Sequence, residues 1–263
     1  MNTRHVVFLG GNGHCTARLT PARAALVREG VRLTEARYPG FEGRPRAGDL
    51  DRFLQAVSDE IRSADRDGSP ARVYATGIGA LIALGLRARG KLRDVPLLLQ
   101  APVLWGLERR WMPRLMRLRP AQTAATRVFA AKGLQRWFVR RHFVRPPSPE
   151  MQAAFFDGYA QCAALPDLFA WFTPRMLRDL ERMLRGRPAA VENVTVWWGG
   201  RDRIVTPREL AWTEKALGVK WPLRVFPDWG HYPMIDAPQA WAHAVAREAL
   251  APRRNATAAA GEA

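Results

Sequence analysis

The sequence predicts an α/β protein with a mostly parallel, doubly wound sheet that is interrupted by a helical insertion. Short apolar runs alternate with segments of helical period before residue 106, and the same rhythm returns after residue 188. Between them, strand-like runs vanish while Arg, Trp, Met and Phe recur at helical spacing. We therefore predict a core of residues 1–106 and 188–250, a basic helical cap of residues 107–187, and a flexible tail of residues 251–263.

Composition narrows the class of protein. The 263 residues suffice for one large domain, and 48% apolar with 25% charged residues is ordinary for a globular chain. No apolar run approaches the roughly 18 residues of a membrane span, and the first strand follows no charged leader, so we expect a cytoplasmic protein. Cys15 and Cys162 lack the spacing of a disulfide framework or a zinc site. We expect neither a metal nor a cofactor.

Strands and helices alternate in order along the predicted core. Strands are expected at residues 5–9, 31–38, 72–76, 95–99, 194–198 and 223–226, the first of them buried. Helices are expected at residues 21–29, 50–64, 81–89, 207–217 and 238–250. Thr20 has the character of an N-cap before Pro21, and residues 206–209 read as a capping box from Thr206 to Glu209.

One stretch indicates a functional site. Residues 73–80 form an apolar run that turns on small residues into a helix, which is the layout of a sharp strand-to-helix elbow. In enzymes built on such an elbow, the central residue is a nucleophile, usually Ser, with small residues two positions to either side. Ala75 and Gly79 are the small flanks here, and the centre is Gly77. The nucleophile position is therefore vacant.

The order of these parts resembles the α/β-hydrolase superfamily over nearly the whole chain. Each motif alone is weak, but five in the right order at suitable spacing are a strong signal for the fold. The matching segments are residues 10–13, 38–41, 75–79, 199–205 and 230–233.

The resemblance implies specific roles. Asp202 and His231 would be the acid and the base of a catalytic triad, with the base facing Gly77. The backbone N–H groups of Asn12 and Ile78 would form the oxyanion hole. Because Gly77 has no side chain, the usual covalent acyl-enzyme is excluded.

Three other side chains near the elbow or the glycine-rich turn are candidates for the site. Thr76 is adjacent to the elbow centre, but its hydroxyl is expected to point away from the side that Gly77 faces. Cys15 follows the glycine-rich turn and could face the pocket, although a lone Cys is more often a small buried hydrophobe. His14 in the same turn is a further candidate for the pocket. His142 and His243 are expected on the surface.

The net charge of +17 points to an anionic partner. Residues 107–187 carry 16 basic and six acidic side chains, so the excess is concentrated in the predicted cap. An acidic carrier protein or a CoA ester would suit this surface, and simply solvated helix faces are the alternative. Nucleic acid is disfavoured because no recognised binding module is present.

Two functions from different classes follow. The first is an enzyme that acts on a small apolar or acyl substrate, an activated ester or thioester, with His231 and Asp202 as general base. Lyase or cyclase chemistry would suit the same site. The second is a non-catalytic binding protein that retains the pair as a relic. A third interpretation, that Gly77 replaces a natural serine, is decided by the natural coding sequence.

Overall fold

The predicted parallel sheet is confirmed. The computed structural model describes residues 4–64, 72–92, 95–116, 118–129 and 131–250. Within these residues a six-stranded sheet runs in the order β2-β1-β3-β4-β5-β6, and every neighbouring pair is parallel. The strands are β1 (Arg4–Leu9), β2 (Val31–Glu35), β3 (Arg72–Thr76), β4 (Leu97–Gln100), β5 (Val194–Gly199) and β6 (Leu223–Phe226).

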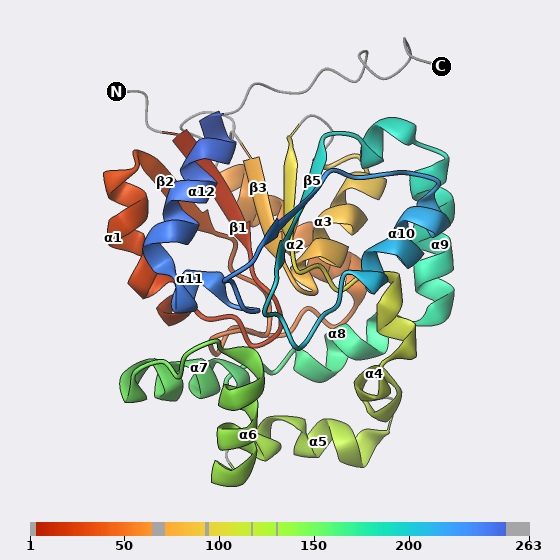
Figure 1. The fold of residues 1–263 in the computed structure, drawn as a ribbon. Helices are drawn as coiled ribbons and strands as arrows, with labels where there is room; N and C mark the ends of the chain where they lie inside the picture. The colour runs from red at the N-terminus through yellow and green to blue at the C-terminus, as the bar shows by residue number, and fades with distance from the viewer. Residues whose placement is uncertain (1–3, 65–71, 93–94, 117, 130, 251–263) are drawn as a thin grey trace.

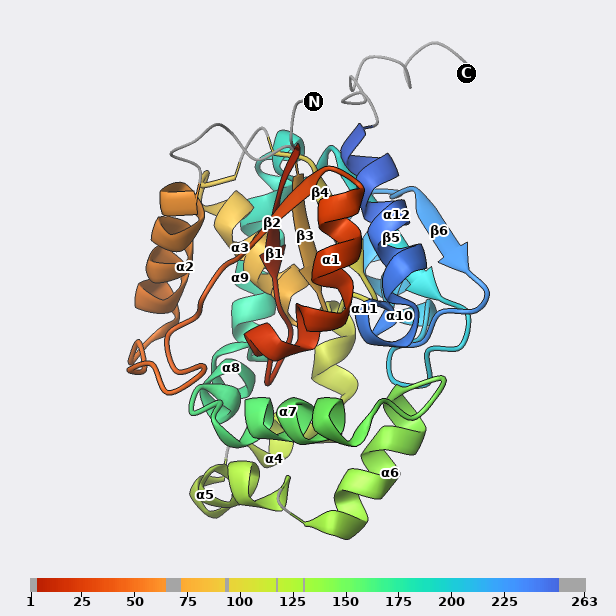
Figure 2. The ribbon, with the colours of Figure 1, turned by 90° about the vertical axis from the view of Figure 1, so that its left-hand side faces the viewer.

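Helices cover both faces of the sheet, so the doubly wound prediction is also confirmed (Figures 1 and 2). One face carries α1 (Thr20–Arg28) and α12 (Pro238–Leu250), which pack on each other. The other face carries α2 (Leu50–Ala64) and α3 (Gly79–Ala88). Apolar residues of α2 recur at helical spacing and are the ones buried, because that stripe must face the sheet.

The chain between β4 and β5 forms helices joined by loops, with no strand in its described part. Six α-helices follow a short 3-10 helix at Trp105–Arg109, and most of them lie below the carboxyl ends of the strands (Figure 1). The last of them returns to the core and packs beside α3. These helices are α4 (Trp111–Leu115), α5 (Arg119–Val128), α6 (Lys132–His142), α7 (Pro149–Ala160), α8 (Leu165–Trp171) and α9 (Pro174–Arg185). The predicted tail, residues 251–263, lies outside the described residues.

Two predicted helix starts are wrong. Thr20 is not an N-cap, because a 3-10 turn at Thr16–Leu19 leads directly into α1 and places Thr20 inside the helix. The capping box at the start of α10 (Arg208–Leu217) does not form. Pro207 is the N-cap residue, and its side chain makes no capping hydrogen bond. The Glu209 carboxylate instead accepts a hydrogen bond from Arg110 at 2.5 Å. A tertiary partner thus takes the side chain that the local motif would use.

The order of strands creates the crevice that holds the site. Because β1 lies between β2 and β3, the chain winds outward in one direction from β1 and in the other from β3. The loops after these two strands therefore diverge at the carboxyl edge of the sheet. Close packing is required there: a Cβ at Gly79 would lie 2.5 Å from the Leu9 carbonyl oxygen and 2.7 Å from that of Gly10.

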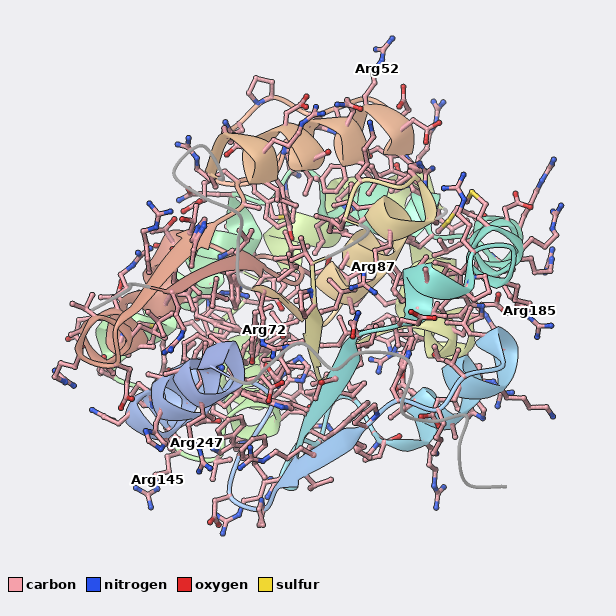
Figure 3. The ribbon with its side chains drawn as sticks, turned by 90° about the horizontal axis from the view of Figure 1, so that it is seen from above. Arg52, Arg72, Arg87, Arg145, Arg185 and Arg247 are labelled. Atoms are coloured by element: carbon pink, nitrogen blue, oxygen red, sulfur yellow. The ribbon has the colours of Figure 1, made fainter. Side chains whose placement is uncertain are left out.

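Part of the arginine excess is structural. Arg87 on α3 is fully buried and its guanidinium donates to the carbonyls of Val95 at 2.5 Å and Ala190 at 3.2 Å. Figure 3 shows Arg87 among the helices and strands, whereas Arg52 and Arg185 extend outward from the molecule. Buried guanidinium groups of this kind tie loops to the sheet through several backbone bonds at once.

We expect Gly79→Ala to destabilise the protein by about 2–3 kcal/mol, because the added methyl collides with two backbone carbonyls that cannot rotate away. Gly133→Ala in α6 is the matched control, since a Cβ there meets nothing within 4 Å. The control should be neutral or stabilising by up to about 1 kcal/mol. Urea unfolding measures both. Equal stabilities would show that the first turn of α3 does not pack tightly on β1.

Candidate active site

A cavity of about 360 Å³ separates the carboxyl edge of the sheet from the helices inserted after β4. Its floor includes Gly77, and its walls are mostly apolar side chains from the insertion, such as Met112, Phe129 and Phe169. A few polar groups face the same space. The site candidates from the sequence that line it are Asn12, Thr76, Gly77, Ile78 and His231.

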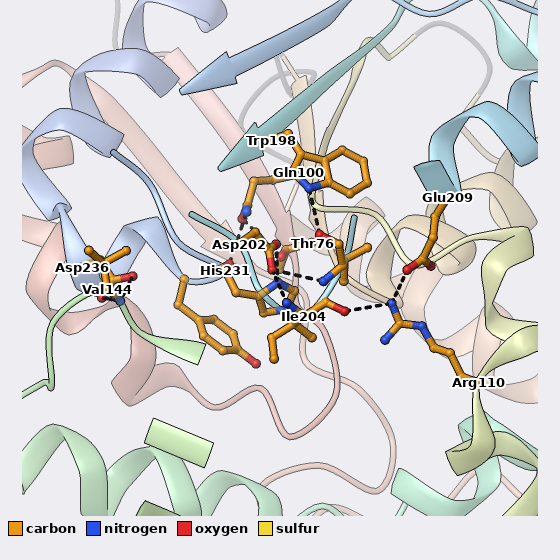
Figure 4. Close-up of polar contacts among 12 residues, drawn as sticks. Thr76, Gln100, Arg110, Val144, Trp198, Asp202, Ile204, Glu209, His231 and Asp236 are labelled. Atoms are coloured by element: carbon orange, nitrogen blue, oxygen red, sulfur yellow. Dashed lines mark hydrogen bonds and ion pairs between the residues drawn. The ribbon is translucent and has the colours of Figure 1, made fainter. Parts of the chain in front are cut away.

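Asp202 and His231 lie together although 29 residues separate them in the chain. Asp202 follows β5 and His231 follows β6, and pairing of these strands brings the two loops side by side (Figure 4). His231 Nδ1 is 2.8 Å from Asp202 Oδ2. The other carboxylate oxygen accepts the N–H groups of Ile204 at 2.7 Å and Val205 at 3.1 Å. The Asp202 side chain is 0% exposed, so its orientation is fixed.

The electrostatics of the pair determine which histidine nitrogen is free. Burial opposes ionisation of Asp202, but the charge and ring N–H of His231 and two backbone amides outweigh it and hold the pKa of Asp202 below its ordinary value. An ionised carboxylate can only accept hydrogen bonds, so the proton of neutral His231 resides on Nδ1. Nε2 is then a lone-pair acceptor on an imidazole that lines the cavity, which is the arrangement of a general base.

The elbow has the backbone geometry expected of a nucleophile turn. Gly77 has φ +57°, and its carbonyl accepts N–H bonds from Ala80 at 3.2 Å and Val103 at 2.9 Å. A Cβ at Gly77 would meet only the Cα of Gly11, at 3.8 Å, which is ordinary contact. The turn is therefore sterically able to hold a side chain that this sequence lacks.

The two residues expected to form an oxyanion hole both line the cavity. Ile78 is the N-cap residue of α3, so its N–H has no partner within the helix. Asn12 lies in the turn after β1, and its carbonyl accepts a 3.2 Å bond from the buried Arg18. Arg18 also donates to the carbonyl of Phe155 on α7 at 3.1 Å, which links this turn to the inserted helices. Both loops thus border the cavity near the N-terminus of α3.

The substitute nucleophiles and His14 have other partners. Among the described residues that define the cavity, neither His14 nor Cys15 contributes to the lining. His14 Nε2 bonds Glu35 at 2.9 Å, and Cys15 packs against α7, where burial raises the pKa of its thiol. Thr76 does line the cavity, but its hydroxyl donates to Gln100 Oε1 at 3.3 Å. None of these three side chains is therefore set up to replace a nucleophile at Gly77.

Gln100 connects the two halves of the site, and sequence reasoning missed it. Its backbone carbonyl accepts the Gly77 N–H at 3.3 Å, and its side-chain amide donates to the His231 carbonyl at 3.2 Å (Figure 4). The side chain is fully buried and also accepts the hydroxyls of Tyr74 and Thr76. The sequence did contain a signal for this role, because Gln100 is a polar residue at the end of an apolar strand. A buried side-chain amide needs several hydrogen-bond partners.

His142 was expected on the surface, and that expectation is wrong. The side chain is buried at the end of α6 and lines the cavity, with its ring centroid 6.0 Å from that of His231. Its Nδ1 donates to the Phe138 carbonyl at 2.9 Å, and burial, followed by the charge of His231, lowers the pKa of His142 to about 2. A second, neutral imidazole therefore borders the site. The neighbouring residues Arg140 and Arg141 suggested a surface position for His142, but they are exposed on other sides of α6.

A carboxylate outside the cavity joins the inserted helices to the core. Asp236 on the short helix α11 (Pro233–Asp236) accepts the Val144 N–H at 3.2 Å (Figure 4). Burial raises the pKa of Asp236 to about 6, although the amides of Val144 and Arg145 and the charge of His231 oppose the shift. The segment after α6 is thus anchored beside the loop that carries His231.

In the described part of the chain, no group of three or more His, Cys, Asp or Glu side chains is arranged to hold a metal ion. None of the helices formed by the described residues has the length and apolarity to cross a bilayer.

A parallel sheet with an elbow after β3, and an Asp–His pair on the loops after β5 and β6, defines the α/β-hydrolase class of protein. One family model, described as the alpha/beta hydrolase family, matches residues 6–244. The chain belongs to this family. No curated protein sequence matches it significantly.

Solved structures share the fold at low sequence identity. The wild-type crystal structure of DBJA matches 95% of this chain and 92% of its own, with 16% identity and a TM-score of 0.70. The haloalkane dehalogenase DbeA from Bradyrhizobium elkani matches 95% and 90%, with 22% identity and a TM-score of 0.63. The thioesterase domain from the curacin biosynthetic pathway matches 95% and 92%, with 14% identity and a TM-score of 0.60. Such likenesses establish the fold alone.

We expect Asp236→Asn to stabilise the protein above about pH 6 and to be neutral near pH 4. The folded-state pKa of Asp236 is raised from its ordinary value near 4, so the folded protein retains a proton that the unfolded chain releases. The stability contributed by this group therefore falls as pH rises from about 4 to 6. Asn keeps the acceptor oxygen for Val144 without the charge.

Melting temperatures of both proteins between about pH 4 and pH 8 measure the effect. The difference between the two melting temperatures should grow as the pH rises from about 4 to 6 and should reach a few degrees. A variant that melts below the wild type above pH 6 would show that the carboxylate stabilises the junction.

Proposed function

We propose that this protein is a hydrolase-like enzyme of small-molecule or acyl metabolism, acting in the cytoplasm on an activated ester or thioester. His231, oriented by Asp202, removes a proton from water or from the substrate itself. The amides of Asn12 and Ile78 stabilise the oxyanion that develops on the acyl carbonyl. Because Gly77 provides no nucleophile, no acyl-enzyme forms at this position.

One observation carries the proposal: the 2.8 Å bond between His231 and a fully buried Asp202, on a histidine that lines the cavity above Gly77. Burying a carboxylate costs free energy, and a loop with only a structural role does not require a buried carboxylate. Three hydrogen bonds offset that cost, and their joint effect is to hold one imidazole with Nε2 unpaired. An oriented base beside an open elbow supports catalysis on a bound acyl group.

The cavity supports the substrate class. Its walls are mainly apolar, so an acyl chain or another apolar group would be bound by burial of its surface. General-base attack by water without a covalent intermediate is slower than triad catalysis. An intrinsically reactive acyl group, such as an aryl ester or a thioester, is therefore the substrate that this site can turn over.

We expect His231→Ala to reduce turnover by about 10²–10⁴-fold, the usual contribution of a positioned general base. The assay is hydrolysis of a panel of aryl esters and acyl thioesters of increasing chain length. His243→Ala is the matched control, because His243 is an exposed histidine on α12 that bonds Glu29 far from the cavity. The control should retain full activity.

If His231→Ala kept full turnover, the general-base proposal would fail. The alternative is a non-catalytic protein that binds its ligand in the same cavity. Calorimetric binding of an acyl ligand with no turnover, unchanged by His231→Ala, would support that alternative.

We expect Gly77→Ser to gain hydrolysis of unactivated esters, by at least ~100-fold over the wild type. The Ser Cβ would lie 3.8 Å from Gly11, so the side chain fits, at a cost of about 1–2 kcal/mol for φ +57°. Gly77→Ala carries the same strain without a hydroxyl and is the matched control. A burst of product in the Ser variant alone would show an acyl-enzyme. Equal rates in all three proteins would mean that the elbow is not the reacting position.

A further inference from the structure

Helices α4, α5 and α6, residues 111–142, are called the cap tip here. They form the end of the molecule opposite the two termini (Figures 1 and 2). This stretch contains eight Lys and Arg residues and no Asp or Glu. Seven of the eight are described with exposed side chains: Arg114, Arg119, Arg127, Lys132, Arg136, Arg140 and Arg141.

The same segment exposes large apolar side chains. Trp111 is 67% exposed, Trp137 52% and Leu118 58%, and Leu115 is also exposed. These four are among only nine large hydrophobic residues that are exposed in the described chain. Exposed apolar side chains that gather within one short segment mark an interaction surface, whereas scattered ones do not.

This surface continues into the active-site cavity. Trp111, Leu115 and Trp137 line the cavity and are exposed to solvent at the same time. Residues with both properties mark the opening through which a ligand enters. The opening of the site therefore lies within the basic and apolar surface of the cap tip.

We propose that the cap tip docks on the surface of an anionic lipid bilayer, with the cavity opening toward the lipid. Trp is favoured at the boundary between headgroups and acyl chains because its ring is amphipathic, and Leu inserts just below that level. Arginines bind headgroup phosphates through paired N–H donors while their aliphatic stems lie along the apolar layer. An acyl substrate then enters the cavity directly from the bilayer, a consequence that rests on the proposed function.

A bilayer fits this surface better than an acidic protein does. A protein interface is recognised by a specific pattern of opposite charges around its apolar centre, and such interfaces commonly carry both signs. The cap tip has one sign only, spread over three helices, and its apolar residues surround a cavity opening. An anionic lipid surface matches uniform positive charge and apolar side chains without requiring any fixed pattern.

Sedimentation with vesicles tests the proposal on the full chain. The wild type should bind vesicles of equimolar phosphatidylcholine and phosphatidylglycerol, should not bind phosphatidylcholine alone, and should be released by salt. Arg114→Glu combined with Arg140→Glu should weaken binding at least ~30-fold, because each basic side chain near an anionic surface contributes about fivefold. Trp111→Ala combined with Trp137→Ala should weaken it roughly tenfold.

Matched controls change similar side chains away from the cap tip. Arg175→Glu with Arg178→Glu alters two exposed arginines of α9, and Trp212→Ala removes a partly exposed Trp of α10. Both should bind like the wild type. The proposal is overturned if the wild type does not sediment with the anionic vesicles, or if the controls lose binding equally. Binding to an acidic carrier protein without binding to vesicles also overturns it. These outcomes do not depend on turnover, so they are separate from failure of the proposed function.

Discussion

The site depends on how closely the first turn of α3 approaches the carboxyl end of β1. Gly79 permits that approach, because any Cβ would collide with two carbonyl oxygens of residues 9 and 10. The parallel register between β1 and β3, with Leu9 beside Ala75, then places the glycine-rich turn against the elbow. Residues of both loops thereby border one cavity. Without this contact the loops would still exist, but they would not share a space.

The Asp202–His231 pair is the second constraint, and it is electrostatic. The Asp202 side chain is fully buried, which alone would favour a neutral carboxyl group, yet the charge of His231 and three hydrogen bonds keep the pKa of Asp202 below its ordinary value. The pair is joined to the elbow through Gln100, which bonds the backbones of both His231 and Gly77. The elbow and the base are therefore held in one network of hydrogen bonds, even though the elbow has no side chain.

The inserted helices are bound to the core by more than apolar contact. Arg18 bonds the turn after β1 to α7, and Asp236 bonds the segment after α6 to the loop that carries His231. Through these contacts the insertion places His142 beside the base. The same insertion carries +10 of the net charge of +17, so its inner side shapes the cavity while its outer side is available for a partner.

Local patterns in the sequence determined the fold class, and they placed α2, β3, β6 and α12 within the bounds that the structure has. In α2 the apolar residues at helical spacing are buried, whereas β6 is an edge strand whose residues are mostly exposed. The resemblance also indicated which positions could form the site. Tertiary structure alone decided where side chains with several competing partners go. His14 turns to Glu35, Glu209 turns to Arg110 and not to its helix terminus, and His142 turns inward. The partners of His14 and Glu209 are distant in sequence, and His142 packs beside His231 of another loop, so no local pattern could place these side chains.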